Sequence, residues 1–376
     1  MRPVWLVIVA ALLAACSSGP KTERPKPLPH YSKDVTVKAA WSHKYGAWKD
    51  APEGRVQPVL ADGLLVAVDG LDWLRGFDAR SGKLRWERRT GVAITGGIAQ
   101  AGDVLLVGTR RGEIIAYGLK DGAVKWEKAL SSEILTPPTV AGEVAVIRSG
   151  DGKVFALNIA DGKRLWEFDR SVPTLSLRGT GRAVIAGDQV FVGFANGKLV
   201  ALNLKDGSLL WEATVATPQG RSELERMVDV DADPLVMGDT VYAAAYQGRV
   251  VALSRDSGRV LWARDMSVYN NMAADKHALY LSDDHGAVWA LDHRSGAALW
   301  KQDNLRNRRL SAPVLFGDYL VVADFEGYLH WLALDDGRLV GRYHVDDAGV
   351  VGTPFPVDNL LYVQGRDGGL EALYYK

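Results

Sequence analysis

The sequence predicts an all-β fold, an eight-bladed β-propeller of four-stranded antiparallel blades. A motif of glycine, alternating apolar residues, Ala-Leu, a polar turn and tryptophan recurs along the chain. Successive tryptophans of this motif lie 38 to 51 residues apart, which suits one propeller blade per repeat. Incomplete repeats stand at both ends of the chain and could combine into one blade. We expect the propeller to occupy residues 35–376.

The motif is most regular in its central copies. The clearest copy runs from Gly152 to Trp166, with Asp161-Gly162 as its turn. In five copies the tryptophan lies fourteen residues after the first glycine: Gly112–Trp126, Gly152–Trp166, Gly197–Trp211, Gly248–Trp262 and Gly286–Trp300. A looser copy ends at Trp86, and the copy that begins at Gly327 has Gly341 in place of tryptophan. The variation falls on the copies nearest the ends.

Each repeat contains the signals of four strands. An apolar run such as Val104–Val107 precedes the motif glycine, and turn pairs such as Asn196-Gly197 join that run to the next, as β-hairpins require. In several repeats a segment that begins with proline, such as Pro138–Val140, precedes the apolar run and is expected to be the first strand. Proline is tolerated there because the missing N–H is not needed at a strand start.

The half-repeats at the ends predict how the ring closes. Gly368 to Tyr375 supplies a third strand without a fourth, and Val35 to Ser42, which contains Trp41, resembles a fourth strand without its blade. Pairing them would cover two exposed sheet edges. Counting Gly341 as a fourth-strand position gives eight blades, and seven is the alternative if the copy at Trp86 or Gly341 is misassigned. A linear solenoid would leave both half-repeats unexplained.

The periodic tryptophans are expected to pack between blades. A large ring at one place in every blade would fill the wedge between neighbouring sheets and bury ~150–250 Å². Stacking on a sugar or a quinone remains an alternative for a single tryptophan.

The first residues predict a lipoprotein leader. Arg2 precedes an apolar run, Val4–Ala15, which is too short to cross a bilayer of ~30 Å as a helix. We interpret residues 1–15 as a signal peptide. The run ends in Leu-Ala-Ala-Cys, which resembles the lipobox of bacterial lipoproteins, so Cys16, the single cysteine, is the predicted lipidation site. Ser17 follows this cysteine. In enterobacterial lipoproteins an Asp at that place commonly retains the protein at the inner membrane, so the resemblance implies that Ser17 directs the protein to the outer membrane.

Residues 16–34 are predicted to be a lipidated tether. They contain Pro20, Pro25, Pro27 and Pro29 among charged and small residues, a composition that favours an extended segment.

The rest of the sequence gives no sign of catalysis, metal binding or a cofactor. The formal net charge is zero, so nothing indicates nucleic-acid binding. The seven histidines are scattered without zinc-site spacing. Asp229, Asp231 and Asp233 alternate as in a calcium loop, but Pro234 and Thr240 replace the glycine and glutamate that such a loop needs. We therefore expect either a solvated acidic loop or an electrostatic contact with a partner.

The string Ala-Leu-x-x-x-Asp-Gly-x-x-x-Trp resembles the quinoprotein repeat of two families, the pyrroloquinoline quinone (PQQ) alcohol dehydrogenases and the BamB lipoproteins. The enzymes are longer, and many carry a vicinal cysteine pair that this chain lacks. The resemblance to BamB covers the whole chain, and three segments are especially similar to that family. They are residues 175–179 (Leu-Ser-Leu-Arg-Gly), 229–231 (Asp-Val-Asp) and 326–331 (Glu-Gly-Tyr-Leu-His-Trp).

The resemblance implies a non-enzymatic scaffold lipoprotein of the outer-membrane β-barrel assembly (BAM) machinery. It would be lipid-anchored in the outer membrane, facing the periplasm, and would assist insertion of β-barrel proteins. Two alternatives stay open: a quinone-dependent periplasmic dehydrogenase, and an unrelated propeller lipoprotein that binds glycan or peptide. Binding to other BAM subunits is implied as well, and contact with nascent outer-membrane proteins is left open.

The resemblance also implies a binding site for the POTRA domains of BamA. The matching residues are Leu175, Leu177, Arg178, Asp229 and Asp231. Two of the longest intervals between tryptophans, 45 and 51 residues, contain them, and extra length in a repeat maps to loops. Leu175 and Leu177 would face the same way on an extended segment. Arg178 could bind the partner, or pair within the chain with Asp229 or Asp231 and hold the loop in its bound shape.

Overall fold

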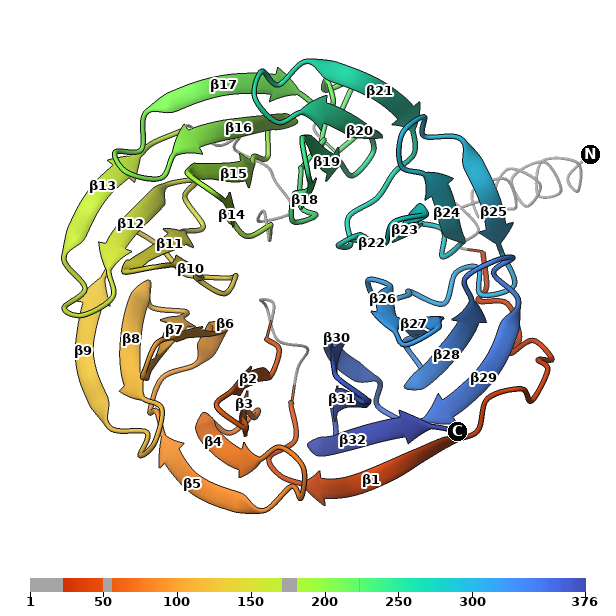
Figure 1. The fold of residues 1–376 in the computed structure, drawn as a ribbon, viewed down its shortest axis with the longest axis horizontal. Coiled ribbons are helices and arrows are strands. Elements are labelled where there is room, and N and C mark those ends of the chain that lie inside the picture. Colours follow the sequence, from red (N-terminus) through yellow and green to blue (C-terminus); the bar gives the residue numbers. More distant parts are fainter. Residues whose placement is uncertain (1–22, 50–55, 171–180, 223) are drawn as a thin grey trace, which may run out of the picture.

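The fold is a closed ring of eight β-sheets (Figure 1). A computed structural model of the 376-residue chain describes residues 23–49, 56–170, 181–222 and 224–376. Within these ranges, 32 strands form eight four-stranded antiparallel sheets. The prediction of an eight-bladed propeller is confirmed, and the seven-bladed alternative is wrong. No helix in the described ranges is long and apolar enough to cross a membrane.

Blades 1 to 4 each use four consecutive strands, ordered from the centre of the ring outwards. Blade 1 comprises β2 (Val59–Ala61), β3 (Leu64–Val68), β4 (Trp73–Asp78) and β5 (Leu84–Arg89). Blade 2 comprises β6 (Ile94–Ala101), β7 (Val104–Thr109), β8 (Glu113–Gly118) and β9 (Val124–Ala129). Blade 3 comprises β10 (Thr139–Ala141), β11 (Val144–Arg148), β12 (Val154–Asn158) and β13 (Arg164–Phe168). Blade 4 comprises β14 (Val184–Ala186), β15 (Gln189–Gly193), β16 (Lys198–Asn203) and β17 (Leu209–Thr214).

Blades 5 to 7 repeat this arrangement, and blade 8 combines the two ends of the chain. Blade 5 comprises β18 (Leu235–Met237), β19 (Thr240–Ala244), β20 (Arg249–Ser254) and β21 (Val260–Asp265). Blade 6 comprises β22 (Ala273–Ala274), β23 (Ala278–Ser282), β24 (Val288–Asp292) and β25 (Ala298–Gln302). Blade 7 comprises β26 (Val314–Phe316), β27 (Tyr319–Ala323), β28 (Tyr328–Ala333) and β29 (Leu339–His344). Blade 8 comprises β30 (Val350–Val357), β31 (Leu360–Gly365), β32 (Gly369–Tyr375) and β1 (Val37–Lys44).

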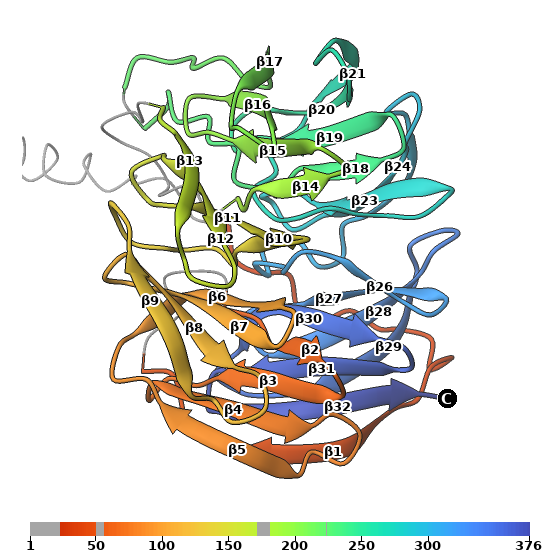
Figure 2. The same ribbon diagram turned by 60° about the vertical axis from the view of Figure 1, so that its left-hand side comes forward.

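The ring closes where β1 pairs with β32, as the half-repeats predict. The pairing is antiparallel and runs from Val37 opposite Tyr375 to Lys44 opposite Gly369. Figure 2 shows these strands side by side although they come from opposite ends of the sequence. Thr36 and Lys376 also exchange two backbone hydrogen bonds, at 3.0 and 3.2 Å. Blade 8 is therefore built from both ends of the chain, and its formation closes the ring.

The connections between strands define two faces of the ring. Because the strands of a blade are antiparallel, the turn between its second and third strands and the connection from its fourth strand to the next blade lie at the same end. We call this the upper face, and the face with the remaining turns the lower face. Backbone hydrogen bonds join neighbouring connections on the upper face, for example from Asn307 N to His285 O at 2.7 Å and from Phe325 N to Arg308 O at 3.1 Å.

The hydrophobic core is divided into eight clusters, one at each junction between blades. The division follows from strand geometry, since successive side chains point to opposite faces of a sheet. On β7, Leu105 and Val107 pack against blade 1, whereas Val104 and Leu106 pack against blade 3. Both faces of each inner strand are thus buried, which is why these strands are apolar at nearly every position.

Tryptophans link seven of the eight junctions. Each lies on the outermost strand of one blade and donates an Nε1 hydrogen bond of 2.8 to 3.1 Å to a backbone carbonyl of the next blade. The donors are Trp41, Trp86, Trp126, Trp166, Trp211, Trp262 and Trp300. The packing role predicted for the periodic tryptophans is confirmed, and the hydrogen bond adds a directional contact between blades.

The glycine of each polar turn accommodates the tryptophan of the preceding blade. At Gly258 a Cβ atom would lie 2.5 Å from the ring of Trp211, and at Gly162 it would lie 2.7 Å from the ring of Trp126. Both glycines have positive φ, 66° and 68°, so the turn geometry also favours glycine. The Asp-Gly and Trp of the motif are therefore coupled between adjacent blades.

The junction between blades 7 and 8 is different, and this explains Gly341. The outermost strand of blade 8 is β1, so this blade has no turn to receive a tryptophan from β29. The preceding segment instead covers β29: a Cβ atom on Gly341 would lie 3.1 Å from the Cβ atom of Val35. Trp331, opposite Gly341 on β28, fills the interior there and is fully buried.

Candidate partner-binding face

Four of the predicted site residues lie outside the described residues. They are Cys16, Leu175, Leu177 and Arg178. The last three belong to the connection from β13 to β14, whose two flanking strands end and begin on the upper face. Their contact with a partner stays a prediction.

Asp229 and Asp231 lie in the connection from β17 to β18, which also belongs to the upper face. Their exposed fractions are 0% and 4%. The backbone around them is fixed to two blades, because Val230 N donates to Phe194 O at 3.2 Å and Tyr246 N donates to Asp229 O at 2.9 Å. The interpretation of this segment as a solvated acidic loop is wrong, since it is packed into the ring.

Asp233 links three connections on the upper face. Its carboxylate accepts the backbone N–H of Arg182 at 2.8 Å and pairs with the Arg182 side chain at 2.9 Å. Asn271 donates to the same carboxylate at 2.9 Å and accepts the backbone N–H of Asp233 at 2.8 Å. Arg182 immediately follows the segment that contains Leu175, Leu177 and Arg178 in the sequence. The end of that connection is thus held in place by side chains from two later blades.

A cavity of about 190 Å³ lies beside these groups, towards the central axis. Its lining comes from blades around the ring and includes the polar residues Gln57, Arg182, Asn270, Ser311 and Thr353. Amide, hydroxyl and guanidinium groups of this kind could bind a polar ligand such as a glycan or a peptide backbone. Among the described residues, no group of three or more His, Cys, Asp or Glu side chains is placed to hold a metal ion.

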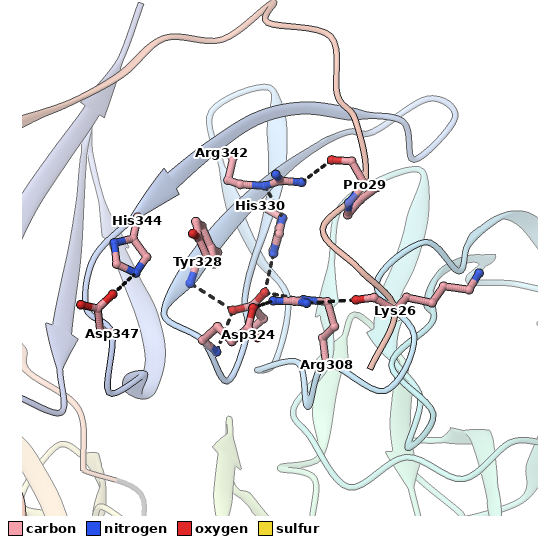
Figure 3. A network of polar contacts seen from close by, with 10 residues as sticks. Lys26, Pro29, Arg308, Asp324, Tyr328, His330, Arg342, His344 and Asp347 are labelled. Atoms are coloured by element: carbon pink, nitrogen blue, oxygen red, sulfur yellow. Dashed lines mark hydrogen bonds and ion pairs between the residues drawn. The ribbon is translucent and has the colours of Figure 1, made fainter. Parts of the chain in front are cut away.

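A second polar cluster on the upper face was not predicted from the sequence. Arg308 donates from Nε to Asp324 at 2.7 Å and pairs with Glu326 through Nη2. Its Nη1 donates to the backbone carbonyl of Lys26 at 3.0 Å, although these residues are 282 apart in the sequence (Figure 3). The guanidinium is 2% exposed and the Asp324 side chain 0%, so this is a buried ion pair. Removing one partner of such a pair typically costs about 3–5 kcal/mol.

The cluster continues to a second arginine on β29. Arg342 donates from Nη2 to the carbonyl of Pro29 at 2.7 Å and lies over the ring of Tyr31 at 4.8 Å (Figure 3). Its Nε is 3.5 Å from Nδ1 of His330, whose Nε2 in turn contacts Asp324 at 2.9 Å. This arrangement suits a neutral imidazole, which has one donor nitrogen and one acceptor nitrogen.

Burial and hydrogen bonding together set the protonation states of His330 and Asp324. Burial lowers the pKa of His330, in spite of the opposing effect of Asp324, so the neutral form is favoured at pH 7. Burial would raise the pKa of Asp324, but hydrogen bonds from His330 and Arg308 bring it below its ordinary value. The cluster therefore holds a charged carboxylate beside a neutral histidine.

Fold and site together define a propeller of the quinoprotein-repeat class whose upper face carries the longest connections. A profile of the family "Outer membrane protein assembly factor BamB" matches residues 70–302 and 290–375. The chain is 42% identical over 368 residues to BamB of Pseudomonas aeruginosa, covering 98% of this chain and 97% of that protein. It is 32% identical over 375 residues to BamB of Escherichia coli, covering 96% of both. The chain belongs to the BamB family, and the resemblance predicted from the sequence is confirmed.

A solved structure of a BamB protein agrees with this assignment. The crystal structure of BamB from Moraxella catarrhalis superposes with a TM-score of 0.82 at 25% identity, covering 90% of this chain and 100% of that one. A quinohemoprotein alcohol dehydrogenase from Comamonas testosteroni superposes with a TM-score of 0.71 at 14% identity, covering 91% of this chain and 76% of that one. The second likeness shows the shared fold alone.

Proposed function

We propose that this protein is a non-enzymatic scaffold of the outer-membrane β-barrel assembly machinery. The observation that carries the proposal is membership of the BamB family along the whole chain, since relatives named as outer membrane protein assembly factors cover at least 96% of it at 32% and 42% identity. In this proposal Cys16 is lipidated and anchors the protein in the outer membrane, facing the periplasm. The propeller binds the POTRA domains of BamA and contacts other subunits of the complex.

The proposed contact with BamA lies on the upper face. Leu175, Leu177 and Arg178 supply the anchors, because interface energy concentrates in a few residues and arginine is enriched among them. Asp229 and Asp231 contribute by shaping the neighbouring connection, since both side chains are buried in the ring. This role differs from the direct electrostatic contact with a partner that the sequence suggests, which would act mainly on the association rate.

Co-purification from outer membranes tests the proposal. The tagged full-length protein is captured from detergent-solubilised outer membranes, and BamA is detected with an antibody. We expect BamA to co-purify with the wild-type protein, and also with Cys16→Ala when the soluble variant is mixed with the same extract. Absence of BamA from both captures would contradict the scaffold function.

A quinone-dependent dehydrogenase is the second candidate, favoured by the fold shared with the alcohol dehydrogenase. Reconstitution with PQQ and calcium, followed by a dye-reduction assay with alcohols, separates the two. The scaffold proposal predicts no alcohol-dependent dye reduction above that of the buffer with PQQ and calcium.

A further inference from the structure

The segment before β1 is bound to the propeller over its whole described length. We call residues 23–36 the strap. Figure 1 shows it passing outside β29 before the chain turns into β1. On the upper face, Lys26 N donates to Arg306 O at 3.0 Å. On the lower face, Asp34 N and Val35 N each donate to Val340 O at 3.1 Å. The strap therefore crosses the outer edge of blade 7 from the upper face to the lower face.

Two arginines and a tyrosine hold the strap at its centre. Arg308 and Arg342 donate to the carbonyls of Lys26 and Pro29, at 3.0 and 2.7 Å (Figure 3). Tyr31 packs against the core cluster at the junction of blades 6 and 7. Arg308 is itself fixed by Asp324, so it presents its Nη1 to the strap in one orientation. These contacts belong to the polar cluster around Arg308 and Arg342, which is separate from the proposed contact with BamA.

The docked strap changes the place at which the chain leading to Cys16 leaves the ring, from the lower face to the upper face. Without docking, the chain would leave the ring at Thr36 on the lower face, and the twenty residues back to Cys16 could span up to about 70 Å. A blade strand of six residues is only about 20 Å long, so such a tether would allow either face to approach a membrane. With the strap docked, the described chain begins at Glu23 on the upper face, where Glu23 contacts Asn307 at 3.2 Å.

Cys16 then lies seven positions before Glu23, a stretch with a maximum span of about 25 Å. We propose that the strap fixes the orientation of the propeller, so that its upper face is turned towards the lipid surface. This inference rests on the lipid anchor at Cys16 in the proposed function. A partner bound to the upper face would then lie between the ring and the membrane, close to the connections β13–β14 and β17–β18.

Distance measurements to the membrane test the orientation. Cys16 is the single cysteine and its thiol is consumed by lipidation, so one introduced cysteine can be labelled selectively. Arg111→Cys and His285→Cys place a fluorophore on the upper face of blades 2 and 6. Lys120→Cys and Arg294→Cys place it on the lower face of the same blades. All four positions are exposed. The lipidated proteins are reconstituted in phosphatidylethanolamine and phosphatidylglycerol vesicles that contain an acceptor-labelled lipid.

We expect energy transfer at least twofold more efficient from the upper-face labels than from the lower-face labels of the same blade. Equal transfer, or stronger transfer from the lower face, would overturn the proposal. Vesicle flotation of the same samples reports the lipid anchor separately. A protein that fails to float contradicts the anchor in the proposed function, whereas one that floats with equal transfer contradicts the strap.

A strap variant provides the matched control. Residues 24–31 are replaced by a Gly/Ser sequence of equal length, which keeps the chain length but removes Tyr31 and the prolines. The difference between the faces should then largely disappear while flotation is retained. If this variant is not folded by circular dichroism, Tyr31→Ala serves instead and should reduce the difference. An undiminished difference in the folded variant would show that another contact orients the ring.

Discussion

Two phenylalanine substitutions should separate hydrogen bonding from burial in the tryptophans. Trp211 is 8% exposed, and its Nε1 donates to Arg255 O at 2.8 Å across the junction of blades 4 and 5. Trp331 is 0% exposed, and its Nε1 has no hydrogen-bond partner among the described residues. Burial alone predicts that Trp331→Phe is the more damaging change, whereas the contacts predict the opposite order.

The magnitudes follow from the groups that each change removes. Trp211→Phe loses a hydrogen bond worth about 1 kcal/mol and leaves the Arg255 carbonyl without its donor. With the packing lost by the smaller ring, we expect a cost of about 2–3 kcal/mol. Trp331→Phe loses similar packing but removes a buried N–H whose burial costs about 1–3 kcal/mol, so the net change should be within about 1 kcal/mol of zero.

Equilibrium unfolding in urea, followed by circular dichroism, measures both values without relying on tryptophan fluorescence. In thermal unfolding of the same variants, a 2 kcal/mol difference in stability corresponds to a Tm difference of about 3 °C for a domain of this size, because the unfolding entropy is about 2.1 cal/mol/K per residue. If Trp331→Phe costs as much as Trp211→Phe, or more, the claim that the inter-blade hydrogen bond stabilises the ring is refuted.

Three further predictions concern the anchor, the closure and the buried histidine. Cys16→Ala should yield a folded protein that incorporates no radioactive fatty acid, and retained label would contradict lipidation at this residue. Deleting residues 369–376 removes β32, which pairs with both β1 and β31, so the whole domain should unfold at much lower urea; an unchanged midpoint would show that closure does not support the ring. Because burial lowers the pKa of His330, the unfolded chain takes up its proton first as the pH falls below about 6.5. The free energy of unfolding should therefore decrease from about pH 7 to pH 5, and less so in His330→Gln; identical pH profiles would exclude His330 as the cause.

The blade architecture could be predicted because its signals are local and repeated. Each turn glycine and each tryptophan lie within one motif, and their repetition counts the blades. The departure at Gly341 looked like a weak repeat in the sequence. The structure shows that it marks the junction where the strap replaces a tryptophan, since a Cβ atom on Gly341 would lie 3.1 Å from the Cβ atom of Val35.

The contacts that the sequence did not reveal join distant residues through the backbone. Arg308 and Arg342 bind carbonyls of Lys26 and Pro29, and a carbonyl carries no side-chain signature. Burial of Asp229 was likewise hidden, because an Asp-x-Asp pattern is the same in a solvated loop and in one packed between blades. Segment 326–331 stands out in the sequence only through its resemblance, and its Glu326 and His330 belong to the polar cluster around Arg308 and Asp324.

Binding of purified POTRA domains tests whether Arg178, in the connection from β13 to β14, anchors BamA. The wild-type protein and Arg178→Ala are titrated against the POTRA domains of BamA by calorimetry, after both show the same circular dichroism and Tm. We expect Arg178→Ala to raise the Kd for the POTRA domains by roughly 30-fold or more, as for a hot spot worth about 2 kcal/mol. A folded Arg178→Ala protein that binds with wild-type Kd would contradict the assigned face.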